Sequence, residues 1–301
     1  MLVKIITKVA PIPLLLALII VSIFEISISL KKPGALIYLS IGNFFIIIEA
    51  LYSYLKQDRV YRLTDSLASL INISLYRSFK LLAYTWIAIT CLGYFSQFSL
   101  WVVPSNTWWA WILVIICCDG SEYYNHILHH KIPLLWTFHS VHHCSDKYNL
   151  TVGVRLSWLS GAYTWIFFIP MVLLGFDPLM IMAGNAIVQG YQFFVHTEYI
   201  HKLGIFEKFM NTPSHHRVHH GANPQYLDKN FAPFSILWDK AFGTFEAEVE
   251  KVRYGLSDPM NSDNPLYFTF REFYRLVKRI FNTSGISSKI ALAWIPTRVK
   301  K

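Results

Sequence analysis

The sequence has few charged residues and few cysteines. Asp, Glu, Lys and Arg make up 15% of its 301 residues, whereas hydrophobic residues make up 54%. The four cysteines (Cys91, Cys117, Cys118 and Cys144) show no CxxC spacing, which argues against a disulfide framework and against a thiolate metal site. The chain also has no internal repeat and no low-complexity tract. So apolar a composition indicates a membrane protein rather than an ordinary soluble domain.

Long apolar runs support that interpretation, because a membrane-spanning helix needs roughly 20 such residues. The runs are Pro11–Leu30, Ala35–Leu55, Leu81–Val103, Trp108–Cys118, Leu156–Leu174 and Met180–Val195. The first run is interrupted by Glu25 and has no small-residue cleavage site, so we expect an anchor rather than a signal peptide. The fourth and sixth runs can also be read as helices buried by their neighbours. We therefore expect an all-α integral membrane protein with four to six membrane helices.

The net charge of +9 raises the question of nucleic acid, but the basic residues flank apolar runs or lie in the tail. They are Lys56, Arg59, Arg62, Arg77, Lys80, Arg271, Arg275, Lys278, Arg279, Arg298, Lys300 and Lys301. This distribution favours contact with anionic lipid headgroups on the cytoplasmic side and argues against nucleic acid. Lys31 and Lys32 do not fit this distribution, because they would lie in the first loop on the outer side of the membrane. A basic amphipathic stretch near Phe268–Phe281 is expected on the membrane surface.

Histidine is absent before His126 and after His220, so all twelve histidines fall in one part of the chain. This divides the sequence into three expected segments: membrane anchor helices (1–103), a catalytic domain (104–250) and a basic tail (251–301). Because His126 follows the fourth apolar run and His196 ends the sixth, the histidines should gather at one face of the membrane. We expect them in a helical cap that faces the cytosol.

The histidines recur three and four residues apart, a spacing that places side chains on one face of a helix. The expected metal ligands are His126, His130, His139, His142, His143, His196, His215, His216, His219 and His220. So many imidazoles exceed the needs of one ion and predict two. Imidazole suits iron, zinc, copper and nickel, so the ligand set alone does not identify the metal. His129 and His201 do not share these faces. For these two residues we weigh a packing or surface role equally with metal ligation.

A ligating imidazole is oriented through its second nitrogen by a neighbouring acceptor. The sequence places several acidic and amide residues near the histidines. The candidates for this orienting role are Asp119, Glu122, Asp146, Asn149, Asp228 and Asp239.

Three motifs resemble those of the fatty acid hydroxylase / sterol desaturase superfamily. They are Asp119 with Tyr123–His126, Leu135–His139 and Trp238–Thr244. Within that superfamily, four further segments resemble the alkylglycerol monooxygenase family. These are His142–Arg155, Phe194–Glu198, Asn211–Gly221 and Phe245–Glu248. The resemblance covers roughly 115–260, and the chain departs from the usual pattern at Ile127 and Lys131.

The resemblance implies a membrane-bound di-iron monooxygenase that uses O2 to hydroxylate the ether-linked alkyl carbon of a glycerol lipid. The resulting hemiacetal would break into an aldehyde and a glycerol derivative. Zinc can replace iron in a purified form of such a protein. The lipid would come from the bilayer, and the electron donor is open, tetrahydrobiopterin or an electron-donor protein being the candidates. The oligomeric state is also open. The resemblance further implies the inner membrane of a bacterium or the endoplasmic reticulum of a eukaryote.

Two other functions remain open at this point. A fatty-acyl or sterol hydroxylase or desaturase would keep the same histidines but change the cavity for the lipid. A zinc-binding membrane protein or transporter would need its ligands along a path through the membrane rather than gathered at one end.

Overall fold

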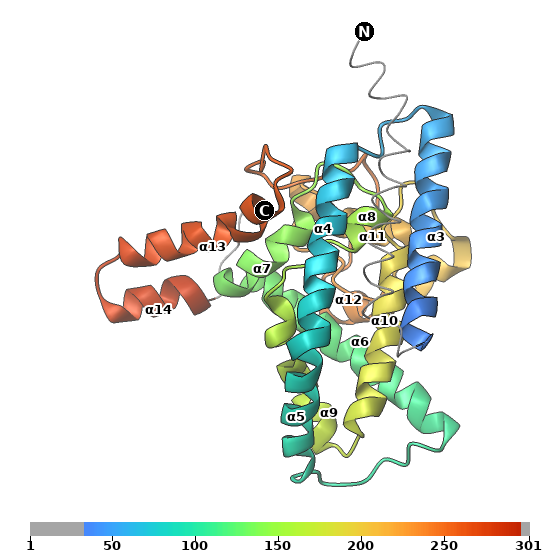
Figure 1. Ribbon diagram of the computed structural model, residues 1–301, viewed down its shortest axis with the longest axis vertical. Helices are drawn as coiled ribbons and strands as arrows, with labels where there is room; N and C mark the ends of the chain where they lie inside the picture. The colour runs from blue at the N-terminus through green and yellow to red at the C-terminus, as the bar shows by residue number, and fades with distance from the viewer. Residues whose placement is uncertain (1–32, 296–301) are drawn as a thin grey trace.

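The computed structural model describes residues 33–295, and this part of the chain contains helices and no strands (Figure 1). The longer helices are α3 (Pro33–Lys56), α4 (Leu63–Phe79), α5 (Thr85–Ser96), α6 (Trp108–Lys131), α7 (Pro133–His143), α10 (Pro178–Phe194), α13 (Pro265–Phe281) and α14 (Ile286–Trp294). The shorter ones are α8 (Leu150–Gly153), α9 (Ile169–Leu173), α11 (Pro213–His220), α12 (Leu237–Phe242) and five single turns of 3-10 or π-helix. The expectation of an all-helical fold is thus met in the described residues.

Four long helical rods, α3, α4–α5, α6 and α10, give the molecule its length (Figure 1). α4 and α5 are joined without a break by a π-helical turn, η1 (Lys80–Tyr84), into one helix from Leu63 to Ser96. Among the described residues, this is the helix that is long and apolar enough to cross a membrane. The run predicted at Leu81–Val103 therefore begins earlier than expected, inside a longer helix.

The predicted run Leu156–Leu174 is not one spanning helix. It is broken into η2 (Ser160–Ala162), η3 (Thr164–Phe168) and α9, and Pro170 lies in the first turn of α9. Proline lacks an N–H group and clashes with the preceding helical turn, so it begins a helix rather than continuing one. The first predicted run, Pro11–Leu30, lies outside the described residues. The expected count of four to six membrane helices is therefore not confirmed.

The lower end of the molecule is an apolar core built where α5, α6, α9 and α10 meet (Figure 1). Ala110 and Val114 of α6 and Ile181 and Val188 of α10 are almost fully buried there. Gly184 lets α10 approach α6 closely, because an added Cβ would lie 3.2 Å from a methyl group of Val114. The absence of a side chain at Gly184 thus sets how closely α6 and α10 pack.

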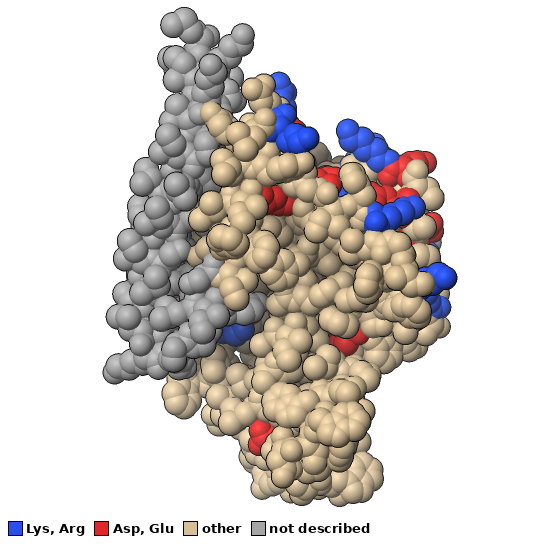
Figure 2. All heavy atoms as spheres, turned by 90° about the vertical axis from the view of Figure 1, so that its right-hand side faces the viewer, with Lys and Arg blue, Asp and Glu red and all other residues tan. Residues whose placement is uncertain are grey.

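The opposite end is a polar cap, which we define as the last two turns of α6 with α7, α8, α11, α12 and the segments that join them. Figure 2 shows that on one face the Lys and Arg side chains lie mainly in the upper part, whereas the lowest part shows almost no charge. Many polar side chains of the cap are buried, including all four residues of Ser214–Arg217. Burial of this kind is stable only where hydrogen bonds compensate it.

The three expected segments are in contact. α13, beyond residue 250, packs on α7 of the histidine-containing segment. Arg62, from the first segment, forms ion pairs with Asp146 and Asp263, from the second and third. The boundaries at 103 and 250 stay predictions.

Candidate metal centre

Three helices and one helix end bring the histidines together in the cap. α6 contributes His126 and His130, one turn apart on the same face. α7 contributes His139, His142 and His143, and it begins at Pro133, whose fixed backbone suits the first helical turn. α11 contributes His216, His219 and His220, and His196 follows the end of α10.

The nine histidines form two adjacent groups. The first group is His126, His130, His139, His143 and His219, and the second group is His142, His196, His216 and His220. Within each group the potential ligand nitrogens lie within 4.8 Å of one another. The groups are neighbours, since the ring centroids of His143 and His220 are 4.4 Å apart. The predicted convergence of these nine side chains is what the structure shows, while ligation itself stays a prediction.

In both groups the Nε2 atoms face one another. In the first group, Nε2 of His139 lies 2.9 Å from that of His126 and 3.1 Å from that of His143. In the second, Nε2 of His196 lies 3.1 Å from that of His142 and 3.0 Å from that of His216. Such a convergence of imidazole nitrogens is the donor arrangement that a transition metal ion requires.

In four of the grouped histidines, the opposite ring nitrogen, Nδ1, faces a main-chain carbonyl oxygen. Nδ1 lies 2.7 Å from the Phe231 oxygen in His126 and 2.9 Å from the Lys229 oxygen in His219. Nδ1 of His142 lies 3.2 Å from the oxygen of Arg155, and that of His196 lies 2.8 Å from the oxygen of Gln192. A carbonyl oxygen only accepts, so Nδ1 carries the proton and Nε2 keeps its lone pair for a metal ion.

Burial keeps the imidazoles of His196 and His220 in the second group neutral. Burial and the neighbouring His142 lower the pKa of His196 and His220 well below the ordinary histidine value. The Nε2 atom of His220 is also buried without a hydrogen-bond partner in the described part of the chain. A neutral imidazole with an unused buried nitrogen fits a metal ligand, because ligation requires the deprotonated nitrogen.

Two of the acidic residues predicted to orient the histidines do so indirectly. Asp239 accepts hydrogen bonds from the backbone N–H groups of Phe231 and Ala232, both at 2.8 Å. Asp119 accepts from those of Phe234 and Ser235. These carboxylates therefore hold the segment whose Phe231 carbonyl faces His126, and they bind backbone rather than the imidazoles.

Asp228 is the predicted acidic residue that comes nearest to an imidazole. Its Oδ1 lies 3.7 Å from Nδ1 of His130, while its Oδ2 accepts from Nζ of Lys131 at 2.9 Å. Lys131, noted above as a departure from the family pattern, thus holds Asp228 beside the first group.

The other predicted orienting residues lie elsewhere. Asn149 caps α8 by accepting from the backbone of Thr151, and its amide donates to the carbonyl oxygen of Val60. Glu122 accepts from Asn125, and Asp146 pairs with Arg62 at the surface. These contacts are with other parts of the fold than the imidazoles, and the orienting role of the three residues stays a prediction.

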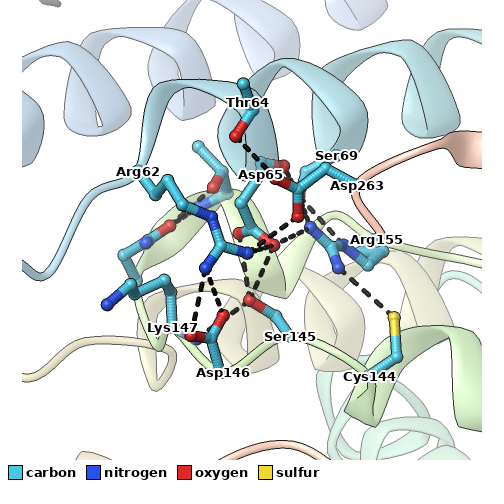
Figure 3. A network of polar contacts seen from close by, with 12 residues as sticks. Arg62, Thr64, Asp65, Ser69, Cys144, Ser145, Asp146, Lys147, Arg155 and Asp263 are labelled. Carbon is cyan, nitrogen blue, oxygen red and sulfur yellow. Dashed lines mark hydrogen bonds and ion pairs between the residues drawn. The ribbon is translucent and has the colours of Figure 1, made fainter. Parts of the chain in front are cut away.

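Arg155 links the second group to the rest of the fold (Figure 3). Its carbonyl oxygen faces His142, and its guanidinium forms a buried ion pair with Asp65 at 2.7 Å. The same guanidinium donates to Ser69 and to the sulfur of Cys144. Spacing could not have revealed this pair, because Asp65 lies 90 residues away in sequence. The available signal was that Asp65 is the one acidic residue in α4.

The structure does not bring His215 into either group. Its Nε2 lies 3.0 Å from a Glu207 carboxylate oxygen, and its Nδ1 lies 3.2 Å from the carbonyl oxygen of Met210. His129 is likewise occupied, with Nε2 2.8 Å from the Tyr163 hydroxyl, and His201 is exposed. The predicted ligand role is thus not supported for His215, because both of its nitrogens face other partners.

Residues 111–244 match the family model described as fatty acid hydroxylase, and this stretch includes all nine grouped histidines. The chain contains a fatty acid hydroxylase domain. The predicted resemblance to that superfamily is confirmed. No solved structure matches the chain.

The fatty acid hydroxylase domain and its flanking helices are similar to curated proteins named alkylglycerol monooxygenase. The protein from Homo sapiens is 36% identical over 239 residues, which cover 77% of this chain and 52% of the relative. That from Danio rerio is 35% identical over 257 residues, covering 83% and 56%. A cholesterol 25-hydroxylase-like protein from Danio rerio is 33% identical over 151 residues, covering 46% and 57%. The chain spans about half the length of these relatives.

Proposed function

We propose that this chain is an oxidoreductase, a lipid monooxygenase that holds two iron ions between its two histidine groups and oxidises the ether-linked alkyl carbon of an alkylglycerol. The observation that carries the proposal is the pair of adjacent groups in which Nε2 atoms face one another and Nδ1 of four rings faces a carbonyl oxygen. The similarity to alkylglycerol monooxygenases supports the choice of substrate.

In the proposed reaction, one atom of O2 is inserted into a C–H bond beside the ether oxygen, and the other atom leaves as water. Two electrons and two protons come from a reductant, for which a reduced pterin or an electron-donor protein is our proposal. The product is a hemiacetal, which breaks its C–O bond to give an aldehyde and a glycerol derivative. When bound, the iron ions supply the activation of O2 that amino-acid side chains lack.

The protein's own residues position the ligands and exclude water. The first group would hold one ion and the second group the other. The carbonyl oxygens of Phe231, Lys229, Arg155 and Gln192 keep Nδ1 protonated and fix the orientation of the rings. Burial of the imidazoles excludes water, which would otherwise compete with the reacting groups.

A sterol or fatty-acyl hydroxylase with the same site is the second candidate. The similarity to a cholesterol 25-hydroxylase-like protein favours it, although that similarity covers a smaller part of the chain. A metal transporter fits less well, because the histidines gather in the cap rather than along the rods that lead to the other end.

We also propose that the polar cap lies at the cytoplasmic face of a membrane and that the apolar rods lie within it. The hairpin of α13 and α14 extends sideways from the cap (Figure 1). Leu266, Phe270, Tyr274 and Phe281 expose an apolar stripe on α13, and Arg275, Lys278 and Arg279 lie beside it. A stripe of this kind with basic neighbours suits the interface of an anionic membrane. A cysteine introduced at exposed Ser287 should react with a membrane-impermeant thiol reagent in inverted vesicles but not in right-side-out vesicles.

The function is tested on purified protein loaded with iron under anaerobic reducing conditions. We expect two irons per chain and, after O2 and an alkylglycerol are added, O2-dependent release of the fatty aldehyde. Two zinc ions with no O2 consumption would contradict the proposal. Hydroxylation of a sterol or an acyl chain without ether cleavage would support the second candidate instead.

A further inference from the structure

A buried carboxylate that the metal chemistry does not use lies next to the first histidine group. Glu122 sits on α6, one helical turn before His126, and is 9% exposed. The preceding part of α6 is almost entirely apolar. A carboxylate buried among apolar helices is costly, and such residues usually have a functional partner.

Glu122 belongs to a cluster of amide side chains contributed by two helices. Nδ2 of Asn125 donates to Glu122 Oε2 at 2.9 Å. From α10, the side chains of Asn185 and Gln189 lie within hydrogen-bonding range of the same carboxylate. We call Glu122, Asn125, Asn185 and Gln189 the amide cluster.

The amide cluster has two acceptors that are not satisfied. Oδ1 of Asn125 and Oδ1 of Asn185 are buried and have no hydrogen-bond partner among the described residues. Asn125 as a whole is only 8% exposed. The amide nitrogen of Asn125 donates to the Glu122 carboxyl group, and this leaves the side-chain oxygen Oδ1 of Asn125 turned away from it.

Unused acceptors beside a carboxylate define the chemistry of a matching ligand. They require donors, and a carboxylate flanked by carbonyl oxygens suits neutral O–H groups rather than an anion such as phosphate. Two separate oxygens, on α6 and on α10, suit a ligand with two hydroxyl groups. A cation is less suited, because two amide nitrogens already occupy the carboxylate.

The position of the cluster connects it with the proposed reaction. Asn125 directly precedes His126. The main-chain carbonyl oxygen of Asn125 accepts from Nδ1 of His129, and the His129 ring lies against His139 of the first group. Glu122, whose carboxylate Asn125 contacts, lies one helical turn, ~5 Å along the helix axis, before His126. A distance of this size separates the hydroxyl groups of the polar head from the ether-adjacent carbon of the lipid.

We propose that the amide cluster binds the two free hydroxyl groups of a glycerol ether lipid and so places its ether-adjacent carbon beside the first histidine group. This inference rests on the proposed function for the identity of the lipid. It assigns selectivity for the polar head to Glu122, Asn125 and Asn185, side chains that the metal site does not require.

The test compares two ligands that differ only in their hydroxyl groups: 1-O-hexadecylglycerol and the same ether with both hydroxyls methylated. Equilibrium binding of each is measured to the iron-loaded, detergent-solubilised protein without O2. The unchanged protein should bind the diol more tightly. Asn185→Leu should weaken binding of the diol about tenfold or more, since a hydrogen-bonding site discriminates strongly against loss of its partner. Binding of the methylated ether should stay the same.

Gln189→Leu serves as a second variant if Asn185→Leu does not fold, because Gln189 is exposed on α10. It should reduce diol binding in the same direction. Asn106→Leu is the matched control, since Asn106 is exposed in the loop between α5 and α6, before the first residue of α6. It should bind both ligands like the unchanged protein.

Equal loss of both ligands, or no change in either, would overturn the inference and leave a structural role for the cluster. Because binding is measured without O2, this result is separate from the proposed function. Selective diol binding without any aldehyde release would sustain the binding site and refute the monooxygenase. Aldehyde release with no preference for the diol would support the monooxygenase and refute the binding site.

Discussion

The cap and the lower end of the molecule are held together by different forces. In the cap, residues far apart in sequence are joined by directed polar contacts, such as those of Asp239 with Phe231 and of Arg155 with Asp65. At the lower end, apolar side chains such as Leu92, Val114 and Met180 pack without direction. Metal geometry should therefore be sensitive to single polar changes in the cap, whereas changes at the lower end should affect stability alone.

The largest effect is expected for His219→Ala, because His219 lies in the middle of the first group, within 3.1 Å of His143 Nε2. We expect loss of bound iron and activity at background level, with the protein still in the membrane. Metal analysis and aldehyde release after membrane extraction measure this. His201→Ala is the control, since His201 is exposed and outside both groups. Full activity of His219→Ala would contradict the assignment of the two histidine groups as the metal centre.

Arg155→Met should have the next largest effect, on stability. It leaves the Asp65 carboxylate, which is 1% exposed, without its cation, and breaking a buried ion pair in this way costs about 3–5 kcal/mol. The free energy of unfolding in detergent measures it. The double variant Asp65→Asn, Arg155→Met should recover part of the loss because no charge remains buried. Arg275→Met, at an exposed pair with Asp258, should leave the free energy of unfolding nearly unchanged, because solvent screens an exposed pair.

Asp239→Asn should weaken metal binding without unfolding the cap. Asparagine replaces one of the two carboxylate oxygens with an amide nitrogen, so either the Phe231 or the Ala232 N–H group loses the oxygen that it faces. The Phe231 carbonyl would then hold His126 less firmly, and changes of this kind lower metal affinity about 10- to 100-fold. Competition with a chelator measures the affinity. Asp146→Asn is the control, because Asp146 is exposed and pairs with Arg62. An unchanged affinity in Asp239→Asn would show that the segment is held by other contacts.

The sequence predicted the cap better than the contacts that support it. Histidine spacing identified the ligand faces of α6, α7 and α11, because side chains three and four apart share a side of a helix. It also included His215, which lies outside both groups, since adjacency in sequence does not show that Glu207 faces its ring. Main-chain carbonyl oxygens orient the rings, and every residue has one, so no residue type could signal them.

The lower end was harder to predict for a different reason. Apolar runs gave α3 and α10 nearly correctly, but the run Leu156–Leu174 is three short helical pieces. Composition measures whether a segment tolerates an apolar environment, and it does not show whether the segment is one helix. Pro170 was the local signal that a continuous helix would end there.

The smallest effect is expected for Gly184→Val, which tests the apolar packing of the lower end. An added side chain would lie within 3.3 Å of Val114 and Cys118, and overpacking of this kind costs about 1–3 kcal/mol. We expect a lower unfolding temperature and the same iron content per folded chain. The matched control is Gly93→Val, because a Cβ at Gly93 meets nothing within 4 Å. If Gly184→Val also lost iron, the rods would set the geometry of the histidines, and the two ends would not be independent.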